Sequence, residues 1–149
     1  LEFFTPDTLL KYTNVQGLQT ISVEEKDRTS SMVLVLEWVT QLLTNHIGFS
    51  LRAGAAEFGG KVKYNMWFAK YNKGDYTKIH QHLPAALFGF VYFVNSPVGS
   101  SPLVFSTSGK KIKAEEGKVV IFPGVLRHHV PKNRCDDRII VAGNVVFTQ

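Results

Sequence analysis

Hydrophobic positions in the first third of the chain follow the period of a helix. In residues 30–49 the apolar side chains recur three, four and seven positions apart, which places them on one helical face. These residues are Met32, Val35, Leu36, Val39, Leu42 and Leu43. Ser30 or Ser31 is suited to cap the helix start, and Gly48 to end it. The pattern predicts a helix that packs on the rest of the fold, and a short helix is also expected at 6–12.

From residue 61 onward the pattern changes to short segments rich in Val, Ile, Phe and Tyr, separated by Gly, Pro, Asn and Ser. Strands are expected at 61–71, 87–95, 102–105, 110–113, 118–122, 127–131 and 138–147. No helical pattern separates them, so an antiparallel jelly roll is favoured over a parallel sheet. We predict a single, mainly β domain over 1–149, in which 1–60 forms helical packing and 61–149 forms the core.

Composition narrows the class of protein only a little. Apolar residues make up 44% of the 149 residues and charged residues 19%, which is typical of a globular domain. One cysteine, Cys135, excludes an internal disulfide framework and favours a reducing cytoplasm. The net charge of +5 comes from dispersed lysines, so we do not expect a nucleic-acid partner. No apolar run is long enough for a membrane span, and we expect no membrane association.

The histidines are the first candidates for chemistry. His80 and His82 lie two apart in an extended segment, so both side chains point to the same face and can bind one ion. The same spacing also fits a polar strand end that binds nothing. His128 and His129 are adjacent, so only one faces inward, and the spacing does not say which. His46 lies at the helix end, where it favours the negative end of the dipole.

Arg138 is the second candidate, because it begins the apolar segment 138–147. By alternation it shares a face with Ile140, Ala142 and Asn144. A buried arginine is costly unless it meets an anion, which would make it a ligand for a carboxylate. The alternatives are an ion pair with Asp136 or Asp137, and simple exposure at the strand start.

Together these segments resemble the Fe(II)/2-oxoglutarate-dependent dioxygenases, particularly the prolyl-4-hydroxylase-like branch and its small relatives in bacteria and phages. The family pattern of His-x-Asp/Glu, a distal His and an Arg or Lys about ten residues later corresponds to His80-x-His82, His128 and Arg138. "YNKGDYTKIHQH" is similar to the family's Tyr-x-x-Gly approach to the first ligand, through Tyr71 and Gly74. "VVIFPGVLRHHVP" is similar to its Phe-Pro approach to the distal ligand, which favours His128 over His129.

The resemblance covers about residues 61–147 and implies a double-stranded β-helix, the family's jelly-roll fold. It implies Fe(II) bound by His80, His82 and His128, with O₂ and 2-oxoglutarate as co-substrates. A facial set of three ligands with open positions suits non-haem iron. Arg138, Tyr71 and Asn144 are the residues expected to bind 2-oxoglutarate, since a guanidinium can bind both oxygens of a carboxylate.

The sequence departs from the family at named positions. His82 stands where the acidic ligand is usual, Ile140 where several relatives have Ser, and Phe93 where a Tyr is expected. Asn144 stands where nucleic-acid demethylases of the family carry a second Arg, which disfavours a nucleic-acid substrate.

Two rival functions share the expected fold. The first is a three-His dioxygenase of the cupin type that does not use 2-oxoglutarate. The second is a catalytically inactive jelly-roll binding protein. Arg138 separates both rivals from a 2-oxoglutarate-dependent hydroxylase, because only the hydroxylase requires this arginine. We predict that hydroxylase, acting on a small-molecule or peptidyl substrate in the cytoplasm, or in that of a host cell if the gene is carried by a phage.

Overall fold

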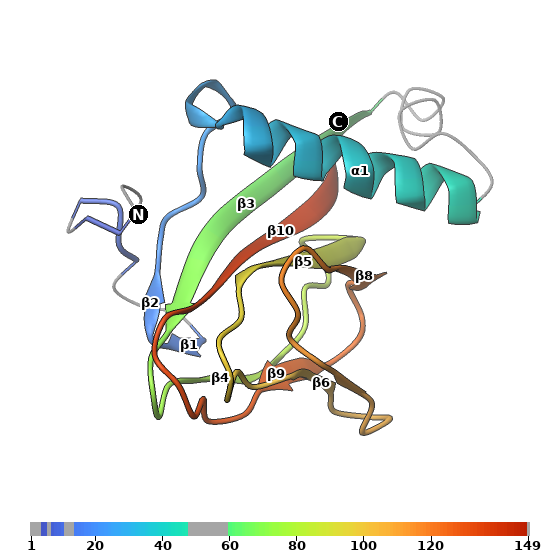
Figure 1. The fold of residues 1–149 in the computed structure, drawn as a ribbon. Coiled ribbons are helices and arrows are strands. Elements are labelled where there is room, and N and C mark those ends of the chain that lie inside the picture. The colour runs from blue at the N-terminus through green and yellow to red at the C-terminus, as the bar shows by residue number, and fades with distance from the viewer. Residues whose placement is uncertain (1–3, 6, 11–13, 48–59, 149) are drawn as a thin grey trace.

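The structure is a computed structural model that describes residues 4–5, 7–10, 14–47 and 60–148. One α-helix, a short 3₁₀ helix and ten strands follow one another along these residues (Figure 1). The elements are β1 (Val15–Gln16), β2 (Leu18–Gln19), η1 (Glu25–Asp27), α1 (Ser30–Ile47), β3 (Lys61–Tyr71), β4 (Tyr76–His80), β5 (Phe88–Asn95), β6 (Leu103–Phe105), β7 (Lys111–Ile112), β8 (Val119–Pro123), β9 (His128–Val130) and β10 (Arg138–Thr148). No helix in the described ranges has the length and apolar character that crossing a bilayer requires.

Two five-stranded antiparallel sheets face each other, with α1 on the outer face of one of them (Figure 1). The major sheet has the strand order β2-β3-β10-β5-β8, and the minor sheet has the order β1-β4-β9-β6-β7. The pairing within both sheets is antiparallel throughout. This arrangement confirms the predicted mainly β jelly roll with an N-terminal helix packed on a sheet.

Helix α1 buries the face that its periodicity predicts. Met32, Leu36, Val39 and Leu43 form one apolar core with residues of the major sheet, including Met66. The cap differs from the prediction, because Thr29 Oγ1 accepts a hydrogen bond from the Met32 N–H at 3.3 Å. Ser30 and Ser31 already belong to the helix, so Thr29 is the first of three adjacent hydroxyl residues that could serve. Gly48, the predicted stop, lies outside the described residues.

A second apolar core fills the space between the two sheets, and β10 contributes to both cores. Its side chains alternate, so one set faces α1 and the other set faces the minor sheet. The set towards α1 is Ile139, Val141 and Val145. The set towards the minor sheet begins with the buried Arg138 and continues with Ile140 and Ala142. The predicted alternation of β10 is therefore confirmed.

Three strands were not expected from the sequence. β1 and β2 are two residues each, and they extend the edges of the minor and the major sheet. β4 carries His80 and pairs with β9, so that His80 lies opposite His128. The helix expected at 6–12 is not formed by the described part of that stretch, where residues 7–8 form a turn and Leu9 bridges to Thr20.

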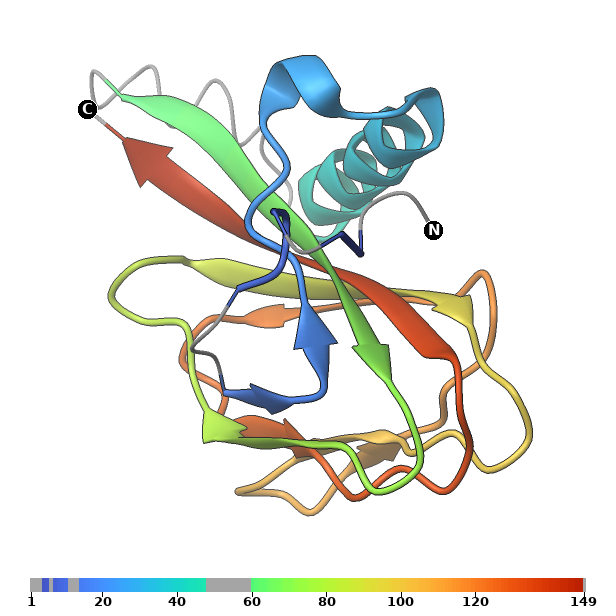
Figure 2. The ribbon, with the colours of Figure 1, turned by 90° about the vertical axis from the view of Figure 1, so that its left-hand side faces the viewer.

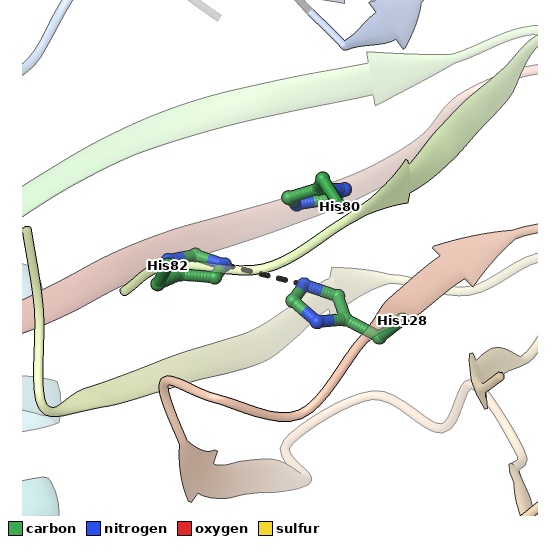
Figure 3. A group of neighbouring side chains, drawn as sticks. All are labelled: His80, His82 and His128. Carbon is green, nitrogen blue, oxygen red and sulfur yellow. Dashed lines mark hydrogen bonds between the residues drawn. The ribbon is translucent and has the colours of Figure 1, made fainter. Parts of the chain in front are cut away.

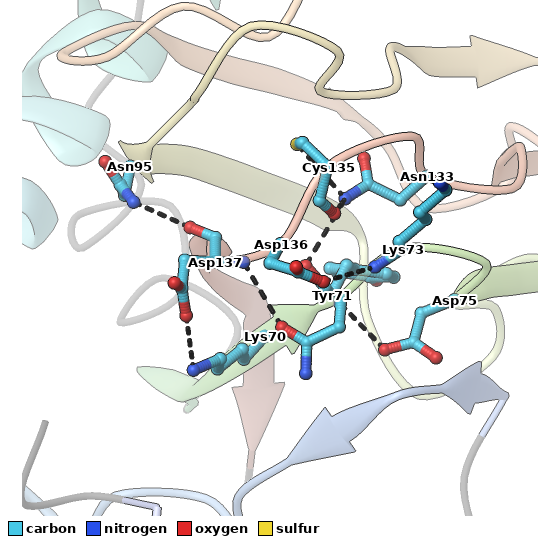
Figure 4. A network of polar contacts seen from close by, with 10 residues as sticks. Lys70, Tyr71, Lys73, Asp75, Asn95, Asn133, Cys135, Asp136 and Asp137 are labelled. Atoms are coloured by element: carbon cyan, nitrogen blue, oxygen red, sulfur yellow. Dashed lines mark hydrogen bonds and ion pairs between the residues drawn. The ribbon is translucent and has the colours of Figure 1, made fainter.

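A polar network fixes the segment that leads into β10 against the turn between β3 and β4 (Figure 4). The Asp137 N–H donates to Asn72 Oδ1 at 3.2 Å, and the Lys73 N–H donates to Asp136 Oδ1 at 3.0 Å. Asp137 also forms an ion pair with Lys70 at 2.5 Å. These contacts hold the start of β10, and with it the backbone of the next residue, Arg138.

Candidate metal centre

Three histidine rings converge between the two sheets (Figure 3). His80 comes from β4, His82 from the segment just after it, and His128 from β9. One ligand nitrogen from each ring lies within 4.8 Å of the other two. The Nε2 atoms of His82 and His128 are 3.2 Å apart. Two nitrogens about 2.1 Å from one ion, at right angles to each other, would be about 3 Å apart. The spacing therefore fits ligation of one ion.

The second nitrogen of each ring is held by a hydrogen-bond acceptor. The Nδ1 of His80 donates to the Lys78 carbonyl at 2.8 Å, and that of His128 donates to the Leu126 carbonyl at 2.8 Å. The Nδ1 of His82 donates to Asn144 Oδ1 on β10. Because carbonyl oxygens only accept, Nδ1 carries the hydrogen in each neutral ring and Nε2 keeps its lone pair.

This choice of tautomer makes the cluster a receptor for a cation. With Nδ1 protonated, the His82 and His128 Nε2 lone pairs oppose each other at 3.2 Å. Such a contact is repulsive unless a proton or a metal ion lies between the two nitrogens. Burial opposes the proton, because it lowers the pKa of each of the three histidines. Three nitrogens on one side of an ion, with the remaining positions open, suit non-haem iron.

His128, and not its neighbour, belongs to the cluster. His128 is 4% exposed and packs against Phe122, with ring centroids 4.6 Å apart. His129 also lines the cavity but is not a member of the cluster, and its Nδ1 hydrogen-bonds with Ser106 Oγ at 3.0 Å. Phe122 can approach because Gly89 leaves room, since a Cβ at that glycine would lie 2.7 Å from the Phe122 ring.

Arg138 is the largest fully buried side chain of the described residues. Its Nε–H donates to the Ser101 carbonyl at 3.1 Å, and its Nη1 has no hydrogen-bond partner. The guanidinium carbon lies 4.7 Å from the centre of the Tyr71 ring and 5.6 Å from that of Phe93. Burial lowers the pKa of Arg138, and its interactions with Tyr71 and Cys135 oppose that shift.

Neither acidic residue that precedes Arg138 neutralises it (Figure 4). The Asp137 carboxylate pairs with Lys70, and the Asp136 carboxylate accepts from the Lys73 backbone. The proposed ion pair of Arg138 with Asp136 or Asp137 is therefore not formed, and the exposed alternative is wrong as well. Within the described residues, the guanidinium has no anionic partner.

The histidine cluster and Arg138 line the same cavity of about 220 Å³. Tyr71 and Thr77 line it too, with their hydroxyls hydrogen-bonded at 2.6 Å. Burial raises the pKa of Tyr71, so its phenol is neutral. Much of the remaining wall is apolar, and includes Trp67, Val91, Leu103, Phe122 and Ile140. Of the residues expected to bind the co-substrate, Asn144 is not in this wall and instead contacts His82.

No protein-family model and no curated protein sequence matches this chain. Solved structures do. A viral collagen prolyl hydroxylase from Paramecium Bursaria Chlorella virus-1, in complex with 2OG, has a TM-score of 0.66 at 16% identity, over 89% of this chain and 80% of that one. An oxidoreductase of the 2OG-Fe(II) oxygenase family from Burkholderia pseudomallei has a TM-score of 0.65 at 13% identity, over 89% and 66%. A Pseudomonas putida prolyl-4-hydroxylase has a TM-score of 0.62 at 17% identity, over 86% and 71%.

The chain has the fold of these oxygenases. The low identities show the fold alone, so the chemistry must be argued from the histidines, Arg138 and the cavity they share.

Metal-free protein should lose stability in acid through its histidine cluster. Burial, opposed by the Leu126 carbonyl, lowers the pKa of His128 to about 4. Between that value and about 6.5 the unfolded chain binds a proton at this histidine and the folded protein does not. The free energy of unfolding therefore decreases as the pH is lowered, and His128 contributes about 2 kcal/mol of this decrease between about pH 7.5 and pH 5. Urea unfolding of the wild type and His128→Gln at both pH values measures the difference, and an equal loss in both would contradict the prediction.

Asn144 should control metal affinity without touching the ion. Asn144→Ala removes the acceptor that holds the His82 ring, and we expect Fe(II) or Co(II) affinity to fall about 10- to 100-fold. Asn65 lies directly opposite Asn144 on β3 and is exposed, so Asn65→Ala is the matched control and should keep wild-type affinity. Anaerobic Co(II) titration followed by absorption measures both. Equal affinity in the two variants would exclude this role for Asn144.

Proposed function

We propose that this protein is an Fe(II)- and 2-oxoglutarate-dependent oxygenase, related in type to the prolyl hydroxylases. One observation carries the proposal. A fully buried arginine with no anionic partner among the described residues shares a cavity with three histidine nitrogens that are set to bind a cation. A cation site and an unpaired buried guanidinium in one cavity are what a ligand with a metal-binding end and a carboxylate end requires.

His80, His82 and His128 would hold the iron through Nε2. When bound, Fe(II) supplies the oxygen chemistry that couples decarboxylation of 2-oxoglutarate to hydroxylation of a C–H bond. The protein fixes the ligand nitrogens before the ion arrives, since two backbone carbonyls and Asn144 already orient the rings. This preorganisation reduces the cost of ordering the ligands on binding.

Arg138 would bind the far carboxylate of 2-oxoglutarate. Its Nη1 has no partner, and its Nε is anchored to Ser101, so the guanidinium is fixed with donors to spare. Tyr71 covers one face of the guanidinium, and its hydroxyl, paired with Thr77, is a second neutral polar group on the wall. A carboxylate placed here would neutralise a charge that the protein otherwise buries unpaired.

The apolar wall would exclude water from the reacting atoms. Phe122 packs on both His82 and His128, with ring centroids 5.8 and 4.6 Å away. Phe93 is fully buried beside Arg138. A dry cavity strengthens the contact between the guanidinium and a carboxylate, because the local dielectric is low.

One observation favours the rival three-His dioxygenase that does not use 2-oxoglutarate. His82 provides nitrogen where a carboxylate would provide a negative charge, so all three ligands are neutral. An ion held in this way keeps its full charge, which suits other anionic co-ligands as well as 2-oxoglutarate. Arg138 favours the 2-oxoglutarate-dependent oxygenase over this rival, because a site that binds no carboxylate there gains nothing from a buried cation with no acidic partner among the described residues.

Calorimetry on anaerobic, Fe(II)-loaded protein tests the proposal. We expect saturable binding of 2-oxoglutarate that requires the metal, because the ion and Arg138 would hold opposite ends of the ligand. Under air, the same protein should convert 2-oxoglutarate into succinate. Fe(II) binding without any 2-oxoglutarate binding would leave the three-His dioxygenase as the better assignment.

A further inference from the structure

The major sheet extends beyond the minor sheet next to the candidate metal centre. β3 and β10 have 11 residues each and pair along their whole length, whereas the strands of the minor sheet have two to five. Figure 2 shows the start of β3 and the end of β10 projecting past the minor sheet. Among the described residues, no strand of the minor sheet lies opposite the inner face of this projection.

The inner face of the projecting part of β3 is polar and exposed. Side chains at even positions of β3 pack towards α1, as Val62, Tyr64 and Met66 do. The side chains at odd positions therefore point to the other face, and there Lys61, Lys63 and Asn65 are exposed. We call these three residues the β3 shelf.

The shelf carries positive charge that is not paired within the part of the chain that the structure describes. Neither Lys61 nor Lys63 forms an ion pair with a described residue. β3 and its partner β10 contain no Asp or Glu. Two exposed lysines two positions apart, on two paired strands that contain no acid, form a local site for an anion.

The shelf is continuous with the cavity. Trp67 lies on the same face of β3 as the shelf and lines the cavity, followed on that face by Ala69 and Tyr71. Asn65, the inner end of the shelf, lies opposite Asn144, which holds His82. At about 3.3 Å per residue, Lys63 is about 13 Å and Lys61 about 20 Å along the strand from Trp67.

We propose that the β3 shelf binds an acidic segment of an extended peptide substrate whose reactive residue enters the cavity. The proposal rests on the proposed oxygenase function of the site. A small acid does not reach from the cavity to the lysines, because the span of about 13–20 Å needs about four to six residues of extended chain. The occupant is therefore a peptide with Asp or Glu about four to six residues from the residue that is modified.

Direct binding to metal-free protein tests the shelf independently of turnover. The probes are fluorescein-labelled Gly/Ser peptides of about fifteen residues with a central proline. Two positions on one side of the proline, about four and six residues away, are varied, and a second set places them on the other side. Versions with Glu, Gln or Lys at those positions are compared by fluorescence polarisation. We expect the Glu peptides to bind about five- to tenfold more tightly than the Gln peptides, with the difference lost at high salt.

Charge reversal identifies the surface responsible. Lys61→Glu/Lys63→Glu should remove the preference for Glu. Lys110→Glu/Lys111→Glu makes the same charge change at two exposed lysines at the start of β7, in the minor sheet, and should keep the preference. Equal binding of Glu and Gln peptides, an equal effect of both double variants, or equal competition by free glutamate would overturn the proposal. Binding of 2-oxoglutarate to the Fe(II)-loaded wild type reports separately on the oxygenase function, so the two failures are distinguishable.

Discussion

Arg138→Met is expected to abolish 2-oxoglutarate binding while leaving the metal-free protein at least as stable as the wild type. The wild-type guanidinium is fully buried, has an unpaired Nη1 and has no acidic partner among the described residues. Truncating one partner of a buried charge pair costs about 2–5 kcal/mol of binding, so affinity should fall at least about 30-fold. Replacing a buried charge by an apolar group of similar volume is often neutral or stabilising.

The pairing of these two results is what makes the test sharp. Calorimetry of 2-oxoglutarate with Fe(II)-loaded protein measures the binding, and urea unfolding of the metal-free protein measures the stability. If Arg138 served only to hold Ser101 through its Nε–H, Arg138→Met would lower the stability, and binding would change only through unfolding. Arg138→Lys is the companion variant, because it keeps the charge and loses the planar fork, and it should retain weak binding.

His128→Ala should cost more than about 100-fold in Fe(II) affinity, and His129→Ala should leave the affinity within about threefold of the wild type. The two residues are neighbours in the sequence, so the two variants differ mainly in whether the lost side chain points into the cluster. His128 points its Nε2 into the cluster, whereas His129 bonds with Ser106. Anaerobic titration with Fe(II) or Co(II), followed by absorption, measures both variants.

The stability of each variant must be measured alongside, because His128 is buried and packs on Phe122. Should His128→Ala fail to fold, His80→Ala removes a half-buried ligand of the same cluster and should show the same loss of metal. Comparable losses in the His128 and His129 variants would mean that the cluster seen in Figure 3 is not the metal site.

Much of the fold was predictable because the long elements have strong periodicity. The strand expected at 61–71 is β3, and that at 138–147 is β10 without its last residue. The sequence did not predict β1 and β2, which are too short for alternation to show. It also did not predict β4, whose segment lacks an apolar run. The Thr29 cap could not be chosen over Ser30, since three successive hydroxyl residues are equally suited to cap a helix.

The candidate site was predictable in its members and not in its connections. Spacing and resemblance indicated His80, His82 and His128, and alternation placed Arg138 on the inner face of its strand. What the sequence could not indicate is the contact between His82 and Asn144, because these residues are 62 positions apart and meet across strands. Equally, only the fold shows that Asp136 and Asp137 are engaged elsewhere, which leaves Arg138 without an acidic partner in the described ranges.

The alternation of β10 has a consequence for how this protein can change over evolutionary time. Its odd positions pack against α1 and maintain the scaffold, whereas its even positions supply Arg138, the cavity wall and the support of His82. Selection for folding and selection for chemistry therefore act on alternate residues of one strand. The residue that supports His82 can therefore change while the residues that secure the sheet stay as they are. Divergent sequences on a shared architecture are the expected outcome.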